Sequence, residues 1–186
     1  MSCAAIVYFT DKGAQLGGML AEKLGCTAQK PPKGGLASLT EKLFHEADAL
    51  IFIGACGIAV RAIAPLIVSK TSDPAVIVLD EQGKHVISLL SGHIGGANDL
   101  ARRIAGYTGG EAVITTATDV NGRFSVDAWA VKHSCVIDSM EHAKEYAASI
   151  LKRDVPLFSD FEICGELPGG VFVGSEGTCG AVISVQ

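Results

Sequence analysis

The sequence predicts an α/β fold: a doubly wound, mostly parallel sheet of about five strands with helices on both faces, plus a small C-terminal α+β segment. Two observations predict this class. The strand-like segments, such as Ala49–Ile53 and Ala75–Leu79, are continuous apolar runs, as expected for strands that are buried on both faces. Most of these runs are also separated by segments with helical spacing of apolar residues, which is typical of parallel sheets.

The predicted elements alternate along the first 130 residues. The expected strands are residues 4–9, 49–53, 75–79, 84–90 and 111–116. The expected helices are residues 14–24, 57–67 and 95–106, with one more that Ser38 or Thr40 caps. The link between strands 75–79 and 84–90 is too short for a crossover, so this pair is expected to be antiparallel. We assign residues 1–130 to this domain and 131–186 to a smaller segment, with a helix at 139–152 and short strands from Pro156.

Composition narrows the function classes. The 186 residues carry a net charge of −5, which gives no support for a nucleic-acid partner. No apolar stretch reaches the roughly 18 residues that a membrane span needs. The six cysteines show no CxxC or other metal-site spacing, and the start of the sequence does not look like a signal peptide. A cytoplasmic protein with reduced thiols and no metal site is therefore expected.

Glycines and polar side chains follow two of the strands, where ligands bind in open α/β sheets. Strand 49–53 is followed by Gly54 and Gly57 at a helix start, with Arg61 one turn later; the alternative is a tight turn with a solvated arginine. Strand 84–90 is followed by a second corner that contains Ser91, Gly92, His93, Gly95, Gly96 and Asn98. In the alternative interpretation, His93 makes a structural hydrogen bond in the turn and Asn98 caps the helix. These residues predict a small-molecule cleft lined by both corners.

Two further polar groups end strands. Strand 111–116 runs into Thr115, Thr116, Thr118 and Asp119, which can bind a ligand or form a capped polar turn. Asp80 and Glu81 are either an acid–base pair or a charged hairpin turn. If strand 84–90 is antiparallel, this pair and His93 lie at opposite ends of that strand. No known nucleophile or nucleotide-binding motif is present, so the residues alone do not identify a reaction.

Four segments together resemble the CbiG family, the cobalt-precorrin-5A hydrolase of anaerobic cobalamin biosynthesis. They are residues 54–66 (GACGIAVRAIAPL), 70–76 (KTSDPAV), 86–98 (VISLLSGHIGGAN, after Asp80-Glu81) and 114–119 (ITTATD). The resemblance is close over residues 50–130. The part of the family members that this chain resembles is their N-terminal and middle portion. Members usually continue into a further C-terminal domain, so the resemblance implies that this domain, or another enzyme of the pathway, is a partner.

The resemblance implies a cobalt-containing tetrapyrrole substrate whose lactone is opened with release of acetaldehyde, giving cobalt-precorrin-5B. Since the cobalt arrives with the substrate, no cofactor is expected. His93 is then the first candidate for the general base, Ser91 with the Gly95 and Gly96 N–H groups for oxyanion stabilisation, and Asp119 for orienting His93 or acting as base. The expected substrate-binding residues are Gly54, Gly57, Arg61, Lys70, Gly92, Gly95, Gly96, Asn98, Thr115, Thr116 and Thr118. A non-catalytic corrinoid-binding module and a generic nucleotide-binding domain are the alternatives.

Overall fold

A computed structural model describes residues 3–174 and 180–184. The chain forms two compact units, residues 1–114 and 115–186. The sequence predicts the boundary between the α/β domain and the smaller segment near residue 130. The compact units divide earlier because Phe124, Val126 and Trp129 pack in the core of the second unit.

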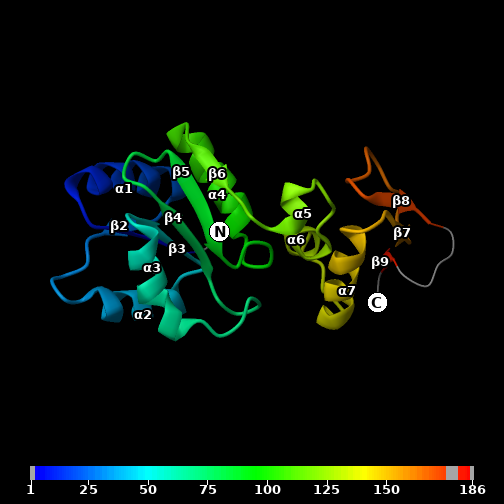
Figure 1. Cartoon of the computed structure of the whole chain (residues 1–186), viewed down its shortest axis with the longest axis horizontal. Helices are drawn as coiled ribbons and strands as arrows, with labels where there is room; N and C mark the ends of the chain where they lie inside the picture. Colours follow the sequence, from blue (N-terminus) through cyan, green and yellow to red (C-terminus); the bar gives the residue numbers. More distant parts are fainter. Residues whose placement is uncertain (1–2, 175–179, 185–186) are drawn as a thin grey trace. The chain divides into compact units, whose positions relative to one another are not determined.

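The first unit is built on a six-stranded sheet with the order β2-β1-β3-β4-β5-β6 (Figure 1). Its strands are β1 (Ala4–Tyr8), β2 (Thr27–Gln29), β3 (Ala49–Ile53), β4 (Ala75–Leu79), β5 (His85–Leu90) and β6 (Glu111–Val113). The predicted fold class is confirmed, with one strand more than the five expected. The additional strand is β2. It escapes prediction because its three residues are of mixed polarity and because it is the outermost strand of the sheet.

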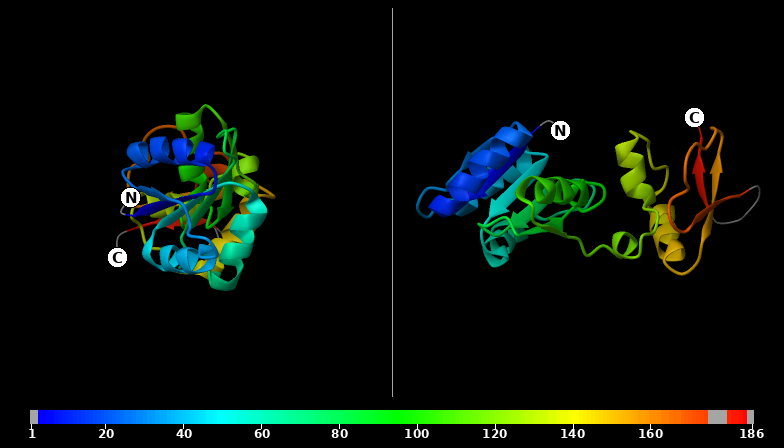
Figure 2. Two further views of the ribbon diagram at one scale, coloured as in Figure 1. Left: turned by 90° about the vertical axis from the view of Figure 1, so that its left-hand side faces the viewer. Right: turned by 90° about the horizontal axis from the view of Figure 1, so that it is seen from above.

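Helices cover both faces of this sheet (Figures 1 and 2). They are α1 (Asp11–Leu24), α2 (Leu36–Glu46), α3 (Cys56–Ile63) and α4 (Ala97–Thr108), with a short 3-10 turn at Ala64–Leu66. One apolar cluster joins α1 and α4 to one sheet face through residues such as Leu20 and Ile104. A second cluster joins α2 and α3 to the other face through Phe44 and Ile63. This double winding is the predicted arrangement.

Three helix starts or ends differ from the prediction. Helix α2 begins after Gly35, so neither Ser38 nor Thr40 is its cap. Helix α3 ends at Ile63, and the chain continues as a 3-10 turn around Pro65, which cannot donate an N–H to a continuing helix. Helix α4 begins after Gly96, whose φ of +79° is left-handed, so Asn98 is not its cap.

The direction of β5 determines the layout of the first unit. Strands β1 to β4 are mutually parallel, whereas β5 pairs antiparallel with β4, with Leu79 opposite Val86. This confirms the antiparallel pair that the short link predicts. Strand β6 is parallel to β5. The carboxyl ends of β5 and β6 therefore lie on the side of the sheet where β3 and β4 begin. We call the two sides of the sheet at which strands begin or end its edges.

The described residues of the second unit form three helices and a small sheet, as expected for an α+β segment. Helices α5 (Ala117–Val120), α6 (Val126–Lys132) and α7 (Met140–Ile150) precede a parallel sheet of order β8-β7-β9, made of β8 (Val171–Val173), β7 (Val155–Ser159) and β9 (Ala181–Ile183). Helix α7 is the predicted amphipathic helix, and the Ser139 side chain caps it by accepting the His142 N–H at 3.2 Å.

Predictions from the sequence also concern membrane-spanning helices, metal sites and cysteines. Across residues 3–174 and 180–184, no helix has the length and apolar character that crossing a membrane requires. In the same ranges no three His, Cys, Asp or Glu side chains are grouped so that they could hold a metal ion. The five cysteines that these ranges contain are free thiols, and Cys179 lies outside the described residues.

Candidate functional site

The two glycine-rich corners lie at opposite edges of the first sheet. Gly54 and Gly57 follow β3 at the edge where β4 ends, whereas the turn of residues 91–96 follows β5 at the edge where β4 begins. The five residues of β4 separate these edges by about 17 Å, at about 3.3 Å per strand residue. The structure therefore does not form the single cleft that the sequence predicts, because β5 runs against β3 and β4.

The corner after β3 contains the Arg61 guanidinium. A Cβ added to Gly57 would lie 3.5 Å from both terminal guanidinium nitrogens, an ordinary van der Waals distance, so the Arg61 guanidinium lies over Gly57 in the first turn of α3. At the same edge, Thr10 Oγ1 donates a 2.6 Å hydrogen bond to Glu81 Oε2. Arg61 is exposed at this corner, and the Glu81 carboxylate at the same edge is already hydrogen-bonded.

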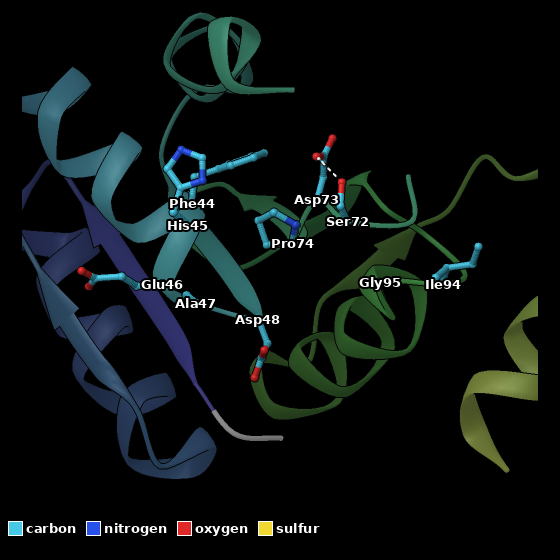
Figure 3. Close-up of a pocket in the computed structure, with 10 residues that line it drawn as sticks. All are labelled: Phe44, His45, Glu46, Ala47, Asp48, Ser72, Asp73, Pro74, Ile94 and Gly95. Atoms are coloured by element: carbon cyan, nitrogen blue, oxygen red, sulfur yellow. Dashed lines mark hydrogen bonds between the residues drawn. The ribbon is translucent and has the colours of Figure 1, made fainter. Parts of the chain in front are cut away.

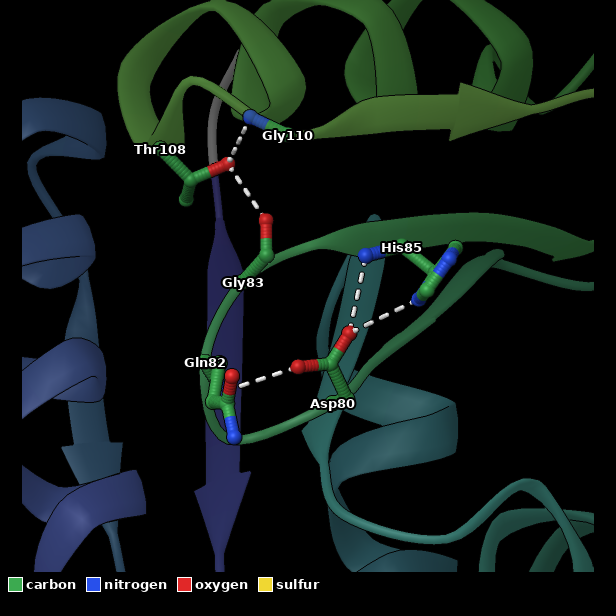
Figure 4. Close-up of polar contacts among 6 residues, drawn as sticks. All are labelled: Asp80, Gln82, Gly83, His85, Thr108 and Gly110. Carbon is green, nitrogen blue, oxygen red and sulfur yellow. Dashed lines mark hydrogen bonds and ion pairs between the residues drawn. The ribbon is translucent and has the colours of Figure 1, made fainter.

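Asp80 has a structural role in the β4–β5 turn (Figure 4). Its carboxylate accepts the Gln82 and His85 N–H groups, both at 2.8 Å, and lies 3.4 Å from His85 Nδ1. Burial acts to raise the pKa of this carboxyl, but the hydrogen bonds from the turn outweigh burial and hold the pKa below its usual range. The hairpin-turn interpretation of Asp80 is the one that the structure supports, and this turn lies at the other end of β5 from His93, as predicted.

The turn of residues 91–96 is tightly constrained around Ser91. Ser91 has a left-handed φ of +57°, which is rare for a residue with a Cβ. Its side chain is buried, and its Oγ donates to the Asp73 carbonyl at 3.0 Å. A serine hydroxyl has one proton, so in this conformation Ser91 does not also donate to an oxyanion. A Cβ on Gly95 would lie 2.4 Å from the Ser91 Cβ, so only glycine fits there.

Most N–H groups at the start of α4 are already used within this turn. Gly96 N donates to the His93 carbonyl at 3.0 Å, Ala97 N to the Ser91 carbonyl at 3.2 Å, and Asn98 N to the Gly92 carbonyl at 2.9 Å. The predicted oxyanion donor Gly96 is therefore occupied. The Gly95 N–H has no acceptor within the part of the chain that the structure describes, which leaves it able to bind an anion or a carbonyl.

Asn98 is buried beneath the turn. It is 3% exposed, and its Oδ1 accepts the Ser88 hydroxyl at 2.7 Å. A Cβ on Gly92 would lie 2.8 Å from the same oxygen. Asn98 therefore connects the end of β5 to the start of α4, which the sequence alone could not distinguish from ligand binding.

A cavity of about 410 Å³ opens beside the turn (Figure 3). Three segments line it: the α2–β3 connection, the loop before β4, and the turn after β5. The residues are Phe44, His45, Glu46, Ala47, Asp48, Ser72, Asp73, Pro74, Ile94 and Gly95. Only Gly95 was predicted as a site residue. Ile94 lies in the same turn as Gly95, and the remaining residues were missed because they precede β3 or β4. The reversed direction of β5 brings His93 to the edge of the sheet where these residues lie.

Lys70 lies at this same edge, in the loop that leads into β4. The loop is held by Asp73, whose carboxylate accepts the Val68 and Ser69 N–H groups at 3.0 Å. Lys70 is exposed to solvent, as is Arg61 at the opposite edge. Of the two predicted cations, the structure therefore places only Lys70 at the edge of the first unit that carries His93.

The predicted residues Thr115 to Asp119 belong to the second unit. Thr116 precedes α5, and its Oγ1 donates to Asp119 Oδ2 at 2.6 Å. Thr118 is buried, whereas Thr115 is exposed. These contacts give Asp119 a local hydrogen-bond partner at the start of α5, and its proposed interaction with His93 stays a prediction.

Known proteins match this chain over most of its length. A cobalt-precorrin-5A hydrolase from Salmonella typhimurium is 46% identical over 149 residues, which cover 79% of this chain and 42% of the relative. A protein of the same name from Priestia megaterium is 41% identical over 121 residues, 65% of this chain and 32% of the relative. The chain thus spans less than half the length of these curated relatives.

A solved structure supports the fold. The crystal structure of a cobalamin biosynthesis protein G homologue from Sulfolobus solfataricus aligns with a TM-score of 0.61 at 22% identity, covering 97% of this chain and 58% of that one. The family model described as Cobalamin synthesis G N-terminal matches residues 38–119. This range includes the whole turn of residues 91–96 and every residue that lines the adjacent cavity. Residues 38–119 are thus similar to the Cobalamin synthesis G N-terminal family.

Proposed function

We propose that this chain acts in cobalamin biosynthesis as a cobalt-precorrin-5A hydrolase, or as the portion of one that carries the His93 site. The observation that carries the proposal is that the cavity and the turn beside it lie wholly within the matched region, residues 38–119. The names of the two curated relatives support the same activity.

The proposed reaction opens the lactone of the substrate and breaks a carbon–carbon bond. Water attacks the lactone carbonyl, and the ring oxygen leaves as an alkoxide on the two-carbon fragment. This oxygen forms a C=O bond as the carbon–carbon bond to the macrocycle breaks, so the fragment departs as acetaldehyde. The macrocycle takes up the electron pair and a proton to give cobalt-precorrin-5B. The cobalt belongs to the substrate, and the proposal assigns no cofactor to the protein. The groups needed from the protein are a base for the proton that is lost and a donor for the developing negative charge.

His93 is the proposed general base. It directly precedes Ile94 and Gly95, which line the cavity, and its ring is half-buried. Histidine suits this role because its ordinary pKa is close to neutral pH. The Gly95 N–H is the proposed oxyanion donor, in place of Ser91 and Gly96, whose protons are used inside the turn. Asp119 remains the second candidate for orienting His93 or acting as base.

The charges around the cavity suggest how a substrate with several carboxylates would be oriented. Glu46, Asp48 and Asp73 line the cavity and disfavour a substrate carboxylate there. Lys70, at the same sheet edge, can pair with a carboxylate outside it. We therefore place the uncharged lactone side of the macrocycle against the cavity and a carboxylate side chain near Lys70.

The deciding experiment incubates the 186-residue chain with cobalt-precorrin-5A without oxygen and assays acetaldehyde. Release that depends on His93 would support the proposal. Binding without release, seen as a change in the visible spectrum, would favour a corrinoid-binding portion that needs the remaining length of its relatives as partner. A chain that does not bind cobalt-precorrin-5A and does not release acetaldehyde would contradict the proposal. Titration with NAD and ATP would then test whether the chain is a nucleotide-binding domain.

A further inference from the structure

We infer that Asp73 is a positioning residue of the proposed hydrolase site, which acts through Ser91 to hold His93 in place. The inference rests on the proposed function for its meaning in catalysis. Its structural part, that Asp73 determines the conformation of the turn of residues 91–96, can be tested without substrate.

The Asp73 carboxylate organises the loop before β4. One oxygen accepts the Val68 and Ser69 N–H groups, both at 3.0 Å, and the other contacts Val68 N at 3.3 Å and Ser72 Oγ at 3.4 Å. Asp73 is only 7% exposed. A buried carboxylate is costly unless it is hydrogen-bonded, so these contacts fix the loop in one conformation.

The Asp73 backbone connects this loop to the turn. Its carbonyl oxygen accepts the Ser91 hydroxyl at 3.0 Å, and both residues are buried. Ser91 needs such a partner because its left-handed φ of +57° costs of order 1 kcal/mol or more for a residue with a Cβ. The hydrogen bond from Ser91 thus stabilises a backbone conformation that is otherwise unfavourable for serine.

Buried polar groups are concentrated at this position. Five polar or charged residues are buried among those that the structure describes, and three of them, Asp73, Ser91 and Asn98, surround the turn. Asn98 holds the other end of the turn through its N–H, which donates to the Gly92 carbonyl. Because buried polar networks specify one conformation when they are satisfied, this arrangement fixes the turn from both ends.

His93 lies two residues after Ser91, inside the segment that these contacts hold. Loss of the Asp73 contacts allows Ser91 to relax from its left-handed conformation, and His93 then moves. Misplacement of a catalytic group by about 1 Å can cost about 100-fold in rate. We therefore expect Asp73 to affect kcat although its carboxylate is occupied by its own loop.

The structural part is tested with Asp73→Ala, Asp73→Asn and the control Thr71→Ala. Asn keeps one oxygen acceptor for the loop N–H groups, and the exposed Thr71 side chain bonds only to Ser69 among the described contacts. NMR follows the His93 ring signals and the amides of Gly92, Gly95 and Gly96. We expect these signals to move in Asp73→Ala, to return towards wild type in Asp73→Asn, and to stay in place in Thr71→Ala.

Unchanged His93 and glycine signals in Asp73→Ala would overturn the inference, whatever the activity of the chain. If Asp73→Ala does not fold, Ser91→Ala removes the same connection from the other side, and the same signals decide. A chain in which these signals move but the wild type neither binds nor converts substrate would leave the structural inference standing and remove the proposed function.

The catalytic part is tested by kinetics on the same variants. We expect Asp73→Ala to lower kcat about 10- to 100-fold with KM changed less than about 3-fold, and Asp73→Asn to recover most of the loss. If Ser91 and Asp73 act as one positioning unit, the double variant Asp73→Ala/Ser91→Ala will be no slower than the slower single variant. Additive losses, or an unchanged kcat in Asp73→Ala, would contradict the assignment.

Discussion

Asn98 Oδ1 accepts the Ser88 hydroxyl at 2.7 Å and thereby connects the body of β5 to the first turn of α4. The same oxygen occupies the space that a side chain on Gly92 would need. The polar side chain that seemed suited to a ligand is therefore a buried connector, and its contribution to stability can be measured.

Asn98→Ala should destabilise the first unit by about 1–3 kcal/mol, because it leaves the Ser88 hydroxyl without its partner and opens a buried space. Chemical denaturation followed by circular dichroism measures the loss. Asn121→Ala is the matched control, since Asn121 is exposed and donates only to its own helix at Ala117. A control that loses as much stability as Asn98→Ala would refute the buried-connector role.

Gly95→Ala should both destabilise the chain and abolish turnover. The added Cβ would lie 2.4 Å from the Ser91 Cβ and 2.9 Å from the Ser91 carbonyl oxygen, so the turn has to change shape. Gly106→Ala in α4 is the control: nothing lies within 4 Å of its added Cβ, and alanine in a helix is favoured by up to about 1 kcal/mol. Thermal melts of the two variants should move in opposite directions, and a Gly95→Ala chain as stable as wild type would be inconsistent with the packing described.

His93→Ala should lose turnover and keep substrate binding. A general base contributes roughly 100- to 10,000-fold in rate, so acetaldehyde release should fall by a factor in that range. The spectral titration with substrate should remain close to wild type. His85→Ala is the control, because this exposed histidine lies at the start of β5, at the opposite edge of the sheet. Normal turnover in His93→Ala would remove His93 as the base and make Asp119 the next candidate.

Lys70→Ala should raise KM about 2- to 5-fold with little change in kcat, since an exposed charge pair contributes about 1 kcal/mol or less. Arg61→Ala should have a smaller effect, because Arg61 lies at the edge of the sheet where β4 ends. Steady-state kinetics of both variants at two salt concentrations test the difference. An Arg61→Ala effect larger than that of Lys70→Ala would place the substrate at the other corner.

Asp80 should make stability depend on pH on the acid side. Its pKa is lower in the folded chain than in the unfolded one, so the unfolded state binds more protons as the pH falls. The stabilisation from Asp80 is complete above the unfolded pKa of the carboxyl and disappears as the pH falls through the lower, folded value. The melting temperatures of wild type and Asp80→Asn should therefore differ at neutral pH and converge in acid. A difference that does not change with pH would contradict the charge-assisted contacts of the turn.

Much of the first unit is predictable because its signals are local. The strands Ala49–Ile53 and Ala75–Leu79 are read directly from unbroken apolar runs. Gly25 ends α1 in a left-handed conformation, as a glycine after a helix predicts. The strand Thr27–Gln29 has no such signal, because at the sheet edge its pairing with β1 and not its own composition makes it a strand.

The candidate site was only partly predictable because its layout depends on strand direction. A glycine-rich turn before a helix looks the same at either edge of a sheet, so Gly57 and His93 seemed to face one cleft. The short link around Gln82 already predicts that β5 is reversed, and the same reversal separates these two residues. Asp73 lies in one of the segments that resemble the family, but its contact with Ser91 could not be read from the sequence, because a backbone carbonyl makes it.

The reversed strand also has a consequence for folding kinetics. Among the residues that the structure describes, the β4–β5 hairpin is the one connection in the six-stranded sheet that joins neighbouring strands without a helix between them. Hairpins close in about 1–10 μs, whereas parallel pairs must wait for a longer crossover to close. We expect this hairpin to form early and the contact between Asp73 and Ser91 to form late. Changes in the Asp80 turn should then mainly alter the folding rate, and changes at Asp73 the unfolding rate.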